Sequence, residues 1–247
     1  MSLPDAVLFD KDGTILPFAP FWTTWTRVFR DALAAAVDVD LTAGGLLDWP
    51  ANTRTASHGS SLDVATMGDV RVRVAAMLRG GGVPDVDARR IVATASDTAD
   101  AVAGAMPVSA HAGLVDAVDA LSAAGVRLGV VTGDDEARAR RQVTALGLAD
   151  RLPVVVGGDR GLPGKPDPAT LVEACTLLGV EPAGGVYVGD SLVDVRAARA
   201  AGFSLAIAYV PLDAELPTWS GEADAVLRRF ADLVPLWGAR PVVDAPR

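Results

Sequence analysis

The chain has 247 residues, of which half are hydrophobic and 21% are charged, and its formal net charge is −9. This length suits one large domain or a core domain with an insert, and the composition excludes global disorder. A negative surface repels phosphate backbones, so we expect no nucleic-acid partner, and no hydrophobic run predicts a membrane span. Because Cys175 is the single cysteine and Met1–Asp5 does not resemble a secretory signal, we expect a cytoplasmic protein.

The first predicted element is a short strand, and a long helical stretch follows it. The hydrophobic run Val7–Phe9 ends at Asp10 and is typical of a buried strand. In the stretch 18–103, helical spacing places five residues on one hydrophobic face: Trp22, Trp25, Phe29, Leu33 and Ala36. Val86–Val102 is expected to form another helix. Between them, Val70–Leu78 fits both a strand and a helix, and we favour the helix.

The remainder of the chain alternates between helices and strands. The predicted helices are Gly113–Ala124, Glu136–Leu146, Pro168–Leu178 and Leu192–Ala201. The predicted strands are Val126–Val131, Val154–Val156, Val186–Val188 and Ser204–Ala208. This alternation indicates an α/β fold with a parallel sheet covered on both faces. We expect a core made of 1–17 and 104–247, with 18–103 inserted as a helical cap domain.

Two aspartates follow the first predicted strand, in the stretch Asp10–Thr14. Ligands bind at the carboxyl ends of strands in open α/β sheets, and Asp10 and Asp12 can both face such a site. One aspartate can attack phosphorus, while a second can serve first as an acid and then as a base. A solvated Asp-Gly turn after a strand is the alternative interpretation.

A hydroxyl and a cation follow two later strands. Thr132 ends the second predicted strand of the core, and its hydroxyl and the amide of Gly133 could hold phosphate oxygens. Lys165 lies between Gly164 and Pro166, just before a predicted helix, and could offer a fixed ammonium group to a phosphoryl group. Taken alone, Thr132-Gly133 is more typical of an ordinary turn, and Lys165 is more typical of a solvated surface lysine.

Asp190 and Asp194 form the last chemistry-bearing pair. Asp190 ends a predicted strand, and helical spacing brings Asp194 to the same side four residues later. In a pocket two such carboxylates need a cation, and Mg²⁺ prefers carboxylate oxygens. The alternative is that Asp194 is a first-turn acid favoured by the helix dipole. In combination, these residues supply the groups that phosphoryl transfer needs.

The order of these residues resembles the motif order of the haloacid dehalogenase superfamily. Asp10–Thr14 looks like its first motif, Thr132 its second and Lys165 its third, and Asp190 with Asp194 looks like its fourth. The closest likeness is to phosphoglycolate-phosphatase-like members with a helical cap. The resemblance implies a Rossmann-like core, and it implies that Asp10 is the nucleophile and a Mg²⁺ ligand.

The resemblance also implies roles for the other residues. Asp12 would be the acid and base and give its backbone carbonyl to the metal, and Asp190 would be the remaining ligand, supported by Asp194. Two departures from the family pattern stand out: Gly133-Asp134 replaces the more usual Asn-Lys/Ser, and Lys11 replaces a hydrophobic residue.

The predicted function is hydrolysis of a small phosphomonoester through an aspartyl-phosphate, with Mg²⁺ as cofactor. The alternatives are a phosphomutase of the same fold, a dehalogenase and a non-enzymatic phosphate-binding module. The dehalogenase is disfavoured because dehalogenation does not need the acid and base that Asp12 supplies. The sequence leaves open which phosphate ester is the substrate, and whether the protein is a monomer or a homodimer.

Selection of the leaving group is assigned to the insert, because the core motifs recognise only a phosphoryl group. Residues of the polar loop 52–63 are candidates for substrate contact: Arg54, His58, Ser60 and Ser61. A solvated loop is the alternative. Outside the motifs, we expect Cys175 to be a core thiol, and we expect the arginines at 138, 140 and 141 to form a solvated helix face.

Overall fold

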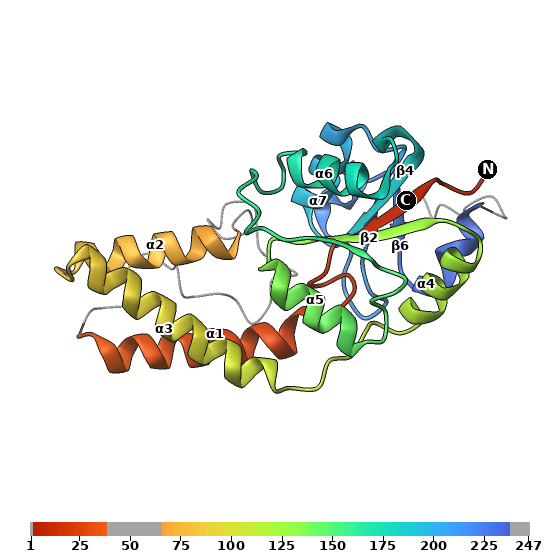
Figure 1. Ribbon diagram of the computed structural model, residues 1–247. Coiled ribbons are helices and arrows are strands. Elements are labelled where there is room, and N and C mark those ends of the chain that lie inside the picture. The colour runs from red at the N-terminus through yellow and green to blue at the C-terminus, as the bar shows by residue number, and fades with distance from the viewer. Residues whose placement is uncertain (1, 39–65, 238–247) are drawn as a thin grey trace. The chain divides into compact units, whose positions relative to one another are not determined.

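The computed structural model describes residues 2–38 and 66–237. The chain divides into two compact units, one of Met1–Pro17 with Val108–Arg247 and one of Phe18–Pro107 (Figure 1). Within the described residues, no helix combines the length and the hydrophobicity that crossing a membrane requires. The first unit is called the core and the second the insert.

A six-stranded parallel sheet forms the centre of the core, in the order β3-β2-β1-β4-β5-β6. The strands are β1 (Ala6–Phe9), β2 (Arg127–Val131), β3 (Val154–Val156), β4 (Gly185–Gly189), β5 (Leu205–Tyr209) and β6 (Ala225–Leu227). Because β1 pairs with both β2 and β4, the strand order reverses at β1, where open α/β sheets bind their ligands.

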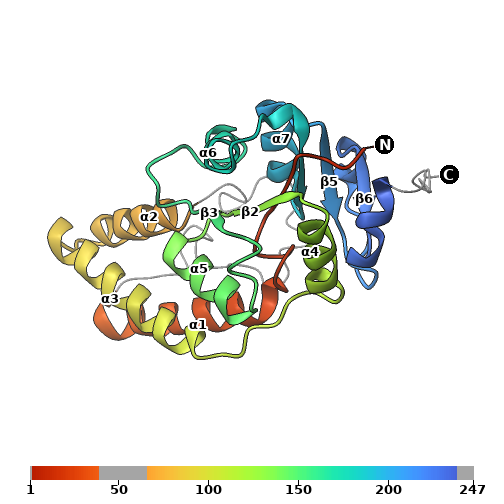
Figure 2. The ribbon, with the colours of Figure 1, turned by 45° about the vertical axis from the view of Figure 1, so that its right-hand side comes forward.

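Four helices cover the two faces of the sheet (Figure 2). They are α4 (Leu114–Ala123), α5 (Glu136–Ala145), α6 (Ala169–Leu178) and α7 (Leu192–Ala201). Side chains alternate across β1: Val7 and Phe9 pack in one hydrophobic cluster with α4 and α5, whereas Leu8 packs in another with α6 and α7. The predicted α/β class is confirmed, and Cys175 is a buried core thiol as expected.

The sixth strand was not predicted. Ala225–Leu227 is only three residues long, lies at the sheet edge and buries only Leu227 fully. So short a segment shows no periodicity in the sequence, and its pairing with β5 makes it a strand. Short 3₁₀ helices accompany these elements: η2 (Pro182–Gly184), η3 (Thr218–Glu222), η4 (Phe230–Asp232) and η5 (Val234–Trp237).

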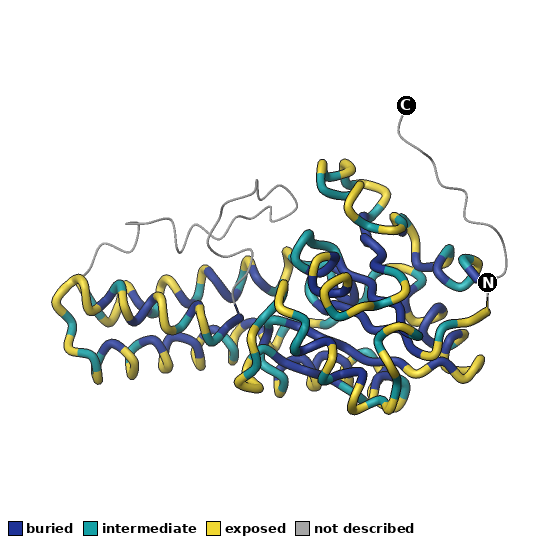
Figure 3. Tube along the Cα trace, turned by 90° about the horizontal axis from the view of Figure 1, so that it is seen from above, coloured by how far each residue is buried: buried dark blue, intermediate teal, exposed yellow. Residues whose placement is uncertain are grey.

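The insert has three described helices with a hydrophobic core of their own: α1 (Phe18–Ala36), α2 (Met67–Gly80) and α3 (Asp85–Gly104). Buried and exposed positions alternate along them (Figure 3). The helix favoured for Val70–Leu78 is confirmed, because Thr66 and Asp69 form a capping box that starts α2. Ala36, expected on the hydrophobic face of α1, is exposed because it lies at the last turn.

Candidate active site

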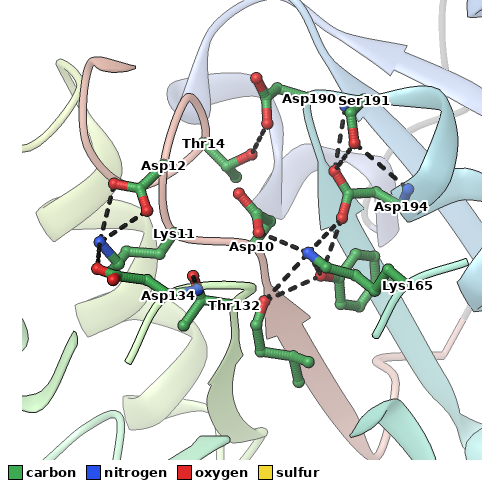
Figure 4. Close-up of polar contacts among 12 residues, drawn as sticks. Asp10, Lys11, Asp12, Thr14, Thr132, Asp134, Lys165, Asp190, Ser191 and Asp194 are labelled. Carbon is green, nitrogen blue, oxygen red and sulfur yellow. Dashed lines mark hydrogen bonds and ion pairs between the residues drawn. The ribbon is translucent and has the colours of Figure 1, made fainter. Parts of the chain in front are cut away.

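Strand register brings the motif residues of the core to one edge of the sheet. Phe9 pairs with Val130 and with Val188, so Asp10, Thr132 and Asp190 all follow their strands at nearly the same level. The amide of Asp10 donates to the carbonyl oxygen of Val188 at 2.8 Å, which extends the ladder to the aspartate itself. The carboxyl ends of β1, β2 and β4 therefore carry Asp10, Thr132 and Asp190, which Figure 4 shows together with Lys165 from the segment after β3.

Three carboxylates gather at this edge. Asp10, Asp190 and Asp194 each offer an oxygen within 4.8 Å of the others. Burial raises the pKa of Asp10 to about 7, an effect that Lys165 opposes and Asp194 reinforces. Burial, with the charges of Asp10 and Asp194, also raises the pKa of Asp190 well above its usual range. Such mutual repulsion, with oxygen donors alone, fits a site for a hard divalent cation.

Lys165 lies among these acids rather than in solvent. Its Nζ lies 2.6 Å from Asp10 Oδ1, 2.6 Å from Asp194 Oδ1 and 3.1 Å from the Tyr187 hydroxyl. Burial lowers the pKa of Lys165, but the two carboxylates outweigh burial and hold that pKa well above its usual value. The interpretation of this residue as a solvated surface lysine is therefore wrong, and the side chain presents a fixed positive charge.

Asp194 is oriented by the start of α7. Ser191 is the N-cap of this helix and accepts from the Asp194 amide, while the amide and hydroxyl of Ser191 donate to Asp194 Oδ2. Asp194 is thus both a first-turn acid and a member of the acidic cluster. Its Oδ2 is held by the helix cap, and its Oδ1 faces Lys165.

Comparison with known proteins identifies the family of this chain. Residues 4–202 match the haloacid dehalogenase-like hydrolases. The chain belongs to this family.

Curated relatives extend the match across most of the chain. It is 37% identical to a phosphoglycolate phosphatase of Rhodospirillum rubrum, covering 94% of this chain and 90% of the relative. It is also 29% identical to an N-acetylmuramic acid 6-phosphate phosphatase of Pseudomonas aeruginosa, covering 98% and 91%. The protein is a phosphatase of the haloacid dehalogenase-like family and is most readily compared with the phosphoglycolate phosphatases.

Solved structures agree on the fold. CbbY from Rhodobacter sphaeroides in complex with phosphate has a TM-score of 0.68 at 24% identity, covering 94% of this chain and 96% of that one. A predicted phosphoglycolate phosphatase from Haemophilus somnus has a TM-score of 0.72 at 19% identity, covering 96% and 99%. At these identities the likeness concerns the α/β core and inserted helices alone.

The phosphatase buries Thr132 and leaves Gly133 half-buried beside it. The hydroxyl oxygen of Thr132 accepts from the amide of Asp134 at 3.1 Å. An accepted bond leaves the hydroxyl hydrogen available as a donor, which suits contact with a phosphate oxygen.

Sequence reasoning missed Tyr187, which lies in β4 beneath the acidic cluster. Its hydroxyl lies 3.2 Å from the carbonyl oxygen of Val131 and 3.3 Å from Asp194 Oδ1, and it also accepts from Lys165. Tyr187 therefore helps to hold both charged side chains. The one available signal was a tyrosine interrupting the valine-rich strand just before Asp190.

The arginines of α5 do not all form a solvated face, so that prediction is wrong for Arg138. Its side chain is 4% exposed and pairs with Asp134 at 2.8 Å and with Asp135 at 3.1 Å. Buried arginines need such carboxylate partners, and helical spacing alone does not show which side of α5 faces them. Arg140 and Arg141 are exposed, as expected.

The predicted leaving-group residues Arg54, His58, Ser60 and Ser61 lie outside the described residues. Their roles stay predictions from the sequence.

Proposed function

We propose that this phosphatase hydrolyses a small phosphomonoester through an aspartyl-phosphate on Asp10, with Mg²⁺ as its cofactor. One observation carries the proposal: Lys165 Nζ lies 2.6 Å from both Asp10 and Asp194, inside a cluster of three carboxylates. The buried nucleophile Asp10, the fixed positive charge of Lys165 and a candidate metal-ion site therefore lie together, as phosphoryl transfer requires.

Asp10 performs the attack in this proposal. Lys165 donates to its Oδ1, so we assign Oδ2 as the oxygen that forms the bond to phosphorus. The phosphorus–oxygen bond to the leaving group then breaks, and Asp12 gives a proton to that oxygen. Asp12 next takes a proton from a water molecule, whose oxygen attacks phosphorus and releases inorganic phosphate from Asp10.

The remaining groups hold the charge that this reaction moves. Asp10 and Asp190 would bind Mg²⁺ through their carboxylates, Asp12 through its backbone carbonyl, and Asp194 would support the site. When bound, Mg²⁺ supplies positive charge against the acidic cluster and the phosphate oxygens. We assign the Thr132 hydroxyl, the Gly133 amide and Lys165 to the transferring phosphoryl group.

The proposed substrate class is a small phosphorylated metabolite such as phosphoglycolate. The curated relatives named as phosphoglycolate phosphatases support this choice, since the relative from Rhodospirillum rubrum covers 94% of the chain. The relative from Pseudomonas aeruginosa makes an amino-sugar phosphate the second candidate. A phosphate-release screen should include both esters, simple sugar phosphates and 4-nitrophenyl phosphate, each with Mg²⁺ and with a chelator.

The covalent mechanism predicts that Asp10→Asn abolishes turnover, because an amide cannot attack phosphorus. Acid-quenched wild-type enzyme should carry a hydroxylamine-labile phosphate after mixing with substrate, whereas Asp10→Asn should carry none. Asp12→Asn should retain the labile phosphate and lose roughly 10²–10⁴-fold in turnover, the usual contribution of general acid–base catalysis. Near-normal phosphate release by purified Asp10→Asn would contradict the covalent mechanism.

A further inference from the structure

The two departures from the family pattern contact one another. Lys11 follows β1 and Asp134 follows β2, and their side chains are 0% and 1% exposed. Lys11 Nζ lies 2.9 Å from Asp134 Oδ2. A buried ammonium group is costly unless partners compensate for its lost hydration. Lys11 and Asp134 therefore form a buried ion pair in which each charge compensates the other.

Lys11 also binds Asp12, the proposed acid and base. Its Nζ lies 2.8 Å from Asp12 Oδ1 and 2.7 Å from Asp12 Oδ2 (Figure 4). It also donates to Gln142 Oε1 at 2.7 Å. An ammonium group has three N–H donors, and three residues, Asp12, Asp134 and Gln142, accept from it. One side chain thus connects the Asp12 carboxylate to the end of β2 and to α5.

The far side of this connection is itself anchored. Arg138 on α5 donates to Asp134 Oδ1 at 2.8 Å, so the two oxygens of Asp134 face two different cations. With both oxygens engaged, Asp134 cannot rotate without losing a buried ion pair. The Lys11 ammonium group is consequently held in one place.

We propose that Lys11, held by Asp134, is a positioning residue that fixes the direction of the Asp12 carboxyl group. The proposal rests on the role of Asp12 given above. Asp12 is the member of this chain of contacts that retains some exposure, at 13% of its side chain. A general acid must lie within hydrogen-bond reach of the leaving oxygen, so fixing its rotamer favours proton transfer. Carboxylate oxygens each have two lone pairs. After contact with Lys11, one lone pair on each oxygen therefore remains to carry the proton that Asp12 transfers.

The test exploits the leaving group. An alkoxide needs a proton to depart, whereas 4-nitrophenolate departs without one. We expect Lys11→Met to lower kcat/KM for an alkyl phosphate such as phosphoglycolate by about 10–100-fold, part of the usual acid–base contribution. The loss on 4-nitrophenyl phosphate should stay within about 3-fold, because that ester depends little on the acid. Arg141→Met, which removes an exposed cation from α5, is the matched control.

A double-mutant cycle shows whether Lys11 acts through Asp12. Asp12→Asn should itself impair the alkyl ester more than the aryl ester, and adding Lys11→Met to it should cause little further loss. Independent effects would multiply. Multiplying losses, equal losses on the two esters in Lys11→Met, or a gain in activity would each overturn the inference. If Asp12→Asn shows no preference between the esters, the acid role proposed above fails instead, and this inference fails with it.

A second variant separates positioning from folding. Lys11→Met alone leaves Asp134 short of one cation, so it should lower the Tm. Lys11→Met/Asp134→Asn removes both charges and keeps an acceptor for Arg138, so its Tm should return toward that of the wild type. Its selective defect on the alkyl ester should persist. A purely structural role for Lys11 requires activity to return together with the Tm, and that result would contradict positioning.

Discussion

At the residue scale, the candidate active site places three carboxylates around a buried lysine. Lys165 offsets part of the repulsion, yet the pKa values of Asp10 and Asp190 remain raised because both groups are buried near other negative charges. Like charges held together weaken the folded state, and a bound cation relieves them. We therefore expect metal binding and stability to be linked at this site.

This linkage predicts an unusual response to Asp190→Asn. The change removes one negative charge while keeping an oxygen acceptor for the Thr14 hydroxyl, which donates to Asp190 at 3.3 Å. Without Mg²⁺, the Tm should rise by a few degrees, since about 1 kcal/mol corresponds to roughly 2–4 °C for a protein of this size. Activity should fall at least about 10²-fold, as expected when metal-ion catalysis worth several kcal/mol is lost.

The measurement is thermal unfolding with and without Mg²⁺. The wild type should gain stability from the metal, and Asp190→Asn should gain little. Asp150→Asn, a charge change at an exposed turn position, should leave the metal response intact. An undiminished Mg²⁺ response in Asp190→Asn would show that the metal binds elsewhere.

At the scale of elements, the junction between β4 and α7 determines where the fourth motif points. Gly189 ends β4, and a Cβ at this position would overlap the side chain of Asp194. The close approach lets Asp194 lie under the strand end, where it reaches both the helix cap and Lys165. A glycine is required here for space, since its backbone conformation is an ordinary one.

The close approach predicts that Gly189→Ala displaces Asp194 and the start of α7. Overpacking of this kind costs about 1–3 kcal/mol of stability. Displacement of Asp194, which pairs with Lys165, should lower kcat by at least about 10-fold, because small misplacements of active-site groups strongly reduce the rate. Steady-state kinetics and thermal unfolding check both expectations. Gly221→Ala is the control, because a Cβ there meets no atom within 4 Å, and wild-type kcat in Gly189→Ala would refute the steric argument.

At the scale of the whole molecule, the two units have separate hydrophobic clusters. The cluster of the insert includes Trp25, which packs with Phe29 and donates to Asp100 Oδ1 across to α3. The clusters of the sheet include Leu121 and Tyr187. The hydrophobic cluster of the insert shares no residue with the clusters of the core. A substitution that destabilises one unit should therefore leave the other unit folded.

Hydrogen exchange measured by mass spectrometry can test this separation. Trp25→Ala removes a large buried side chain, which typically costs about 3–5 kcal/mol, so exchange should rise in α1, α2 and α3. Peptides covering β1, β2 and β4 should keep wild-type exchange. Leu121→Ala should give the reverse pattern. A rise throughout the sheet in Trp25→Ala would mean that the two units unfold as one.

Local sequence was sufficient for most of the elements and for the positions of the motif residues. The strand Val154–Val156 is indicated by its run of valines, and helices such as Leu192–Ala201 are indicated by periodicity, glycine stops and caps within about ten residues. In a parallel sheet, residues that follow adjacent strands meet at one edge. A shared edge for Asp10 and Asp190 was therefore predictable from the strand ends, whereas their meeting with Asp194 at one metal site was implied by the family resemblance and the adjacency of β1 and β4 came from the structure.

Only the tertiary structure decided which charges are buried and with what they pair. Lys11 and Gln142 lie 131 positions apart, and nothing in either local sequence indicates their contact. The burial of Arg138, the place of Tyr187 beneath Lys165 and the edge strand β6 likewise depend on neighbours from distant segments. A side chain's partners are set by strand register and helix packing, which sum many weak contacts across the whole core. Local periodicity specifies an element and the face it buries, but it does not specify the residue that will meet that face.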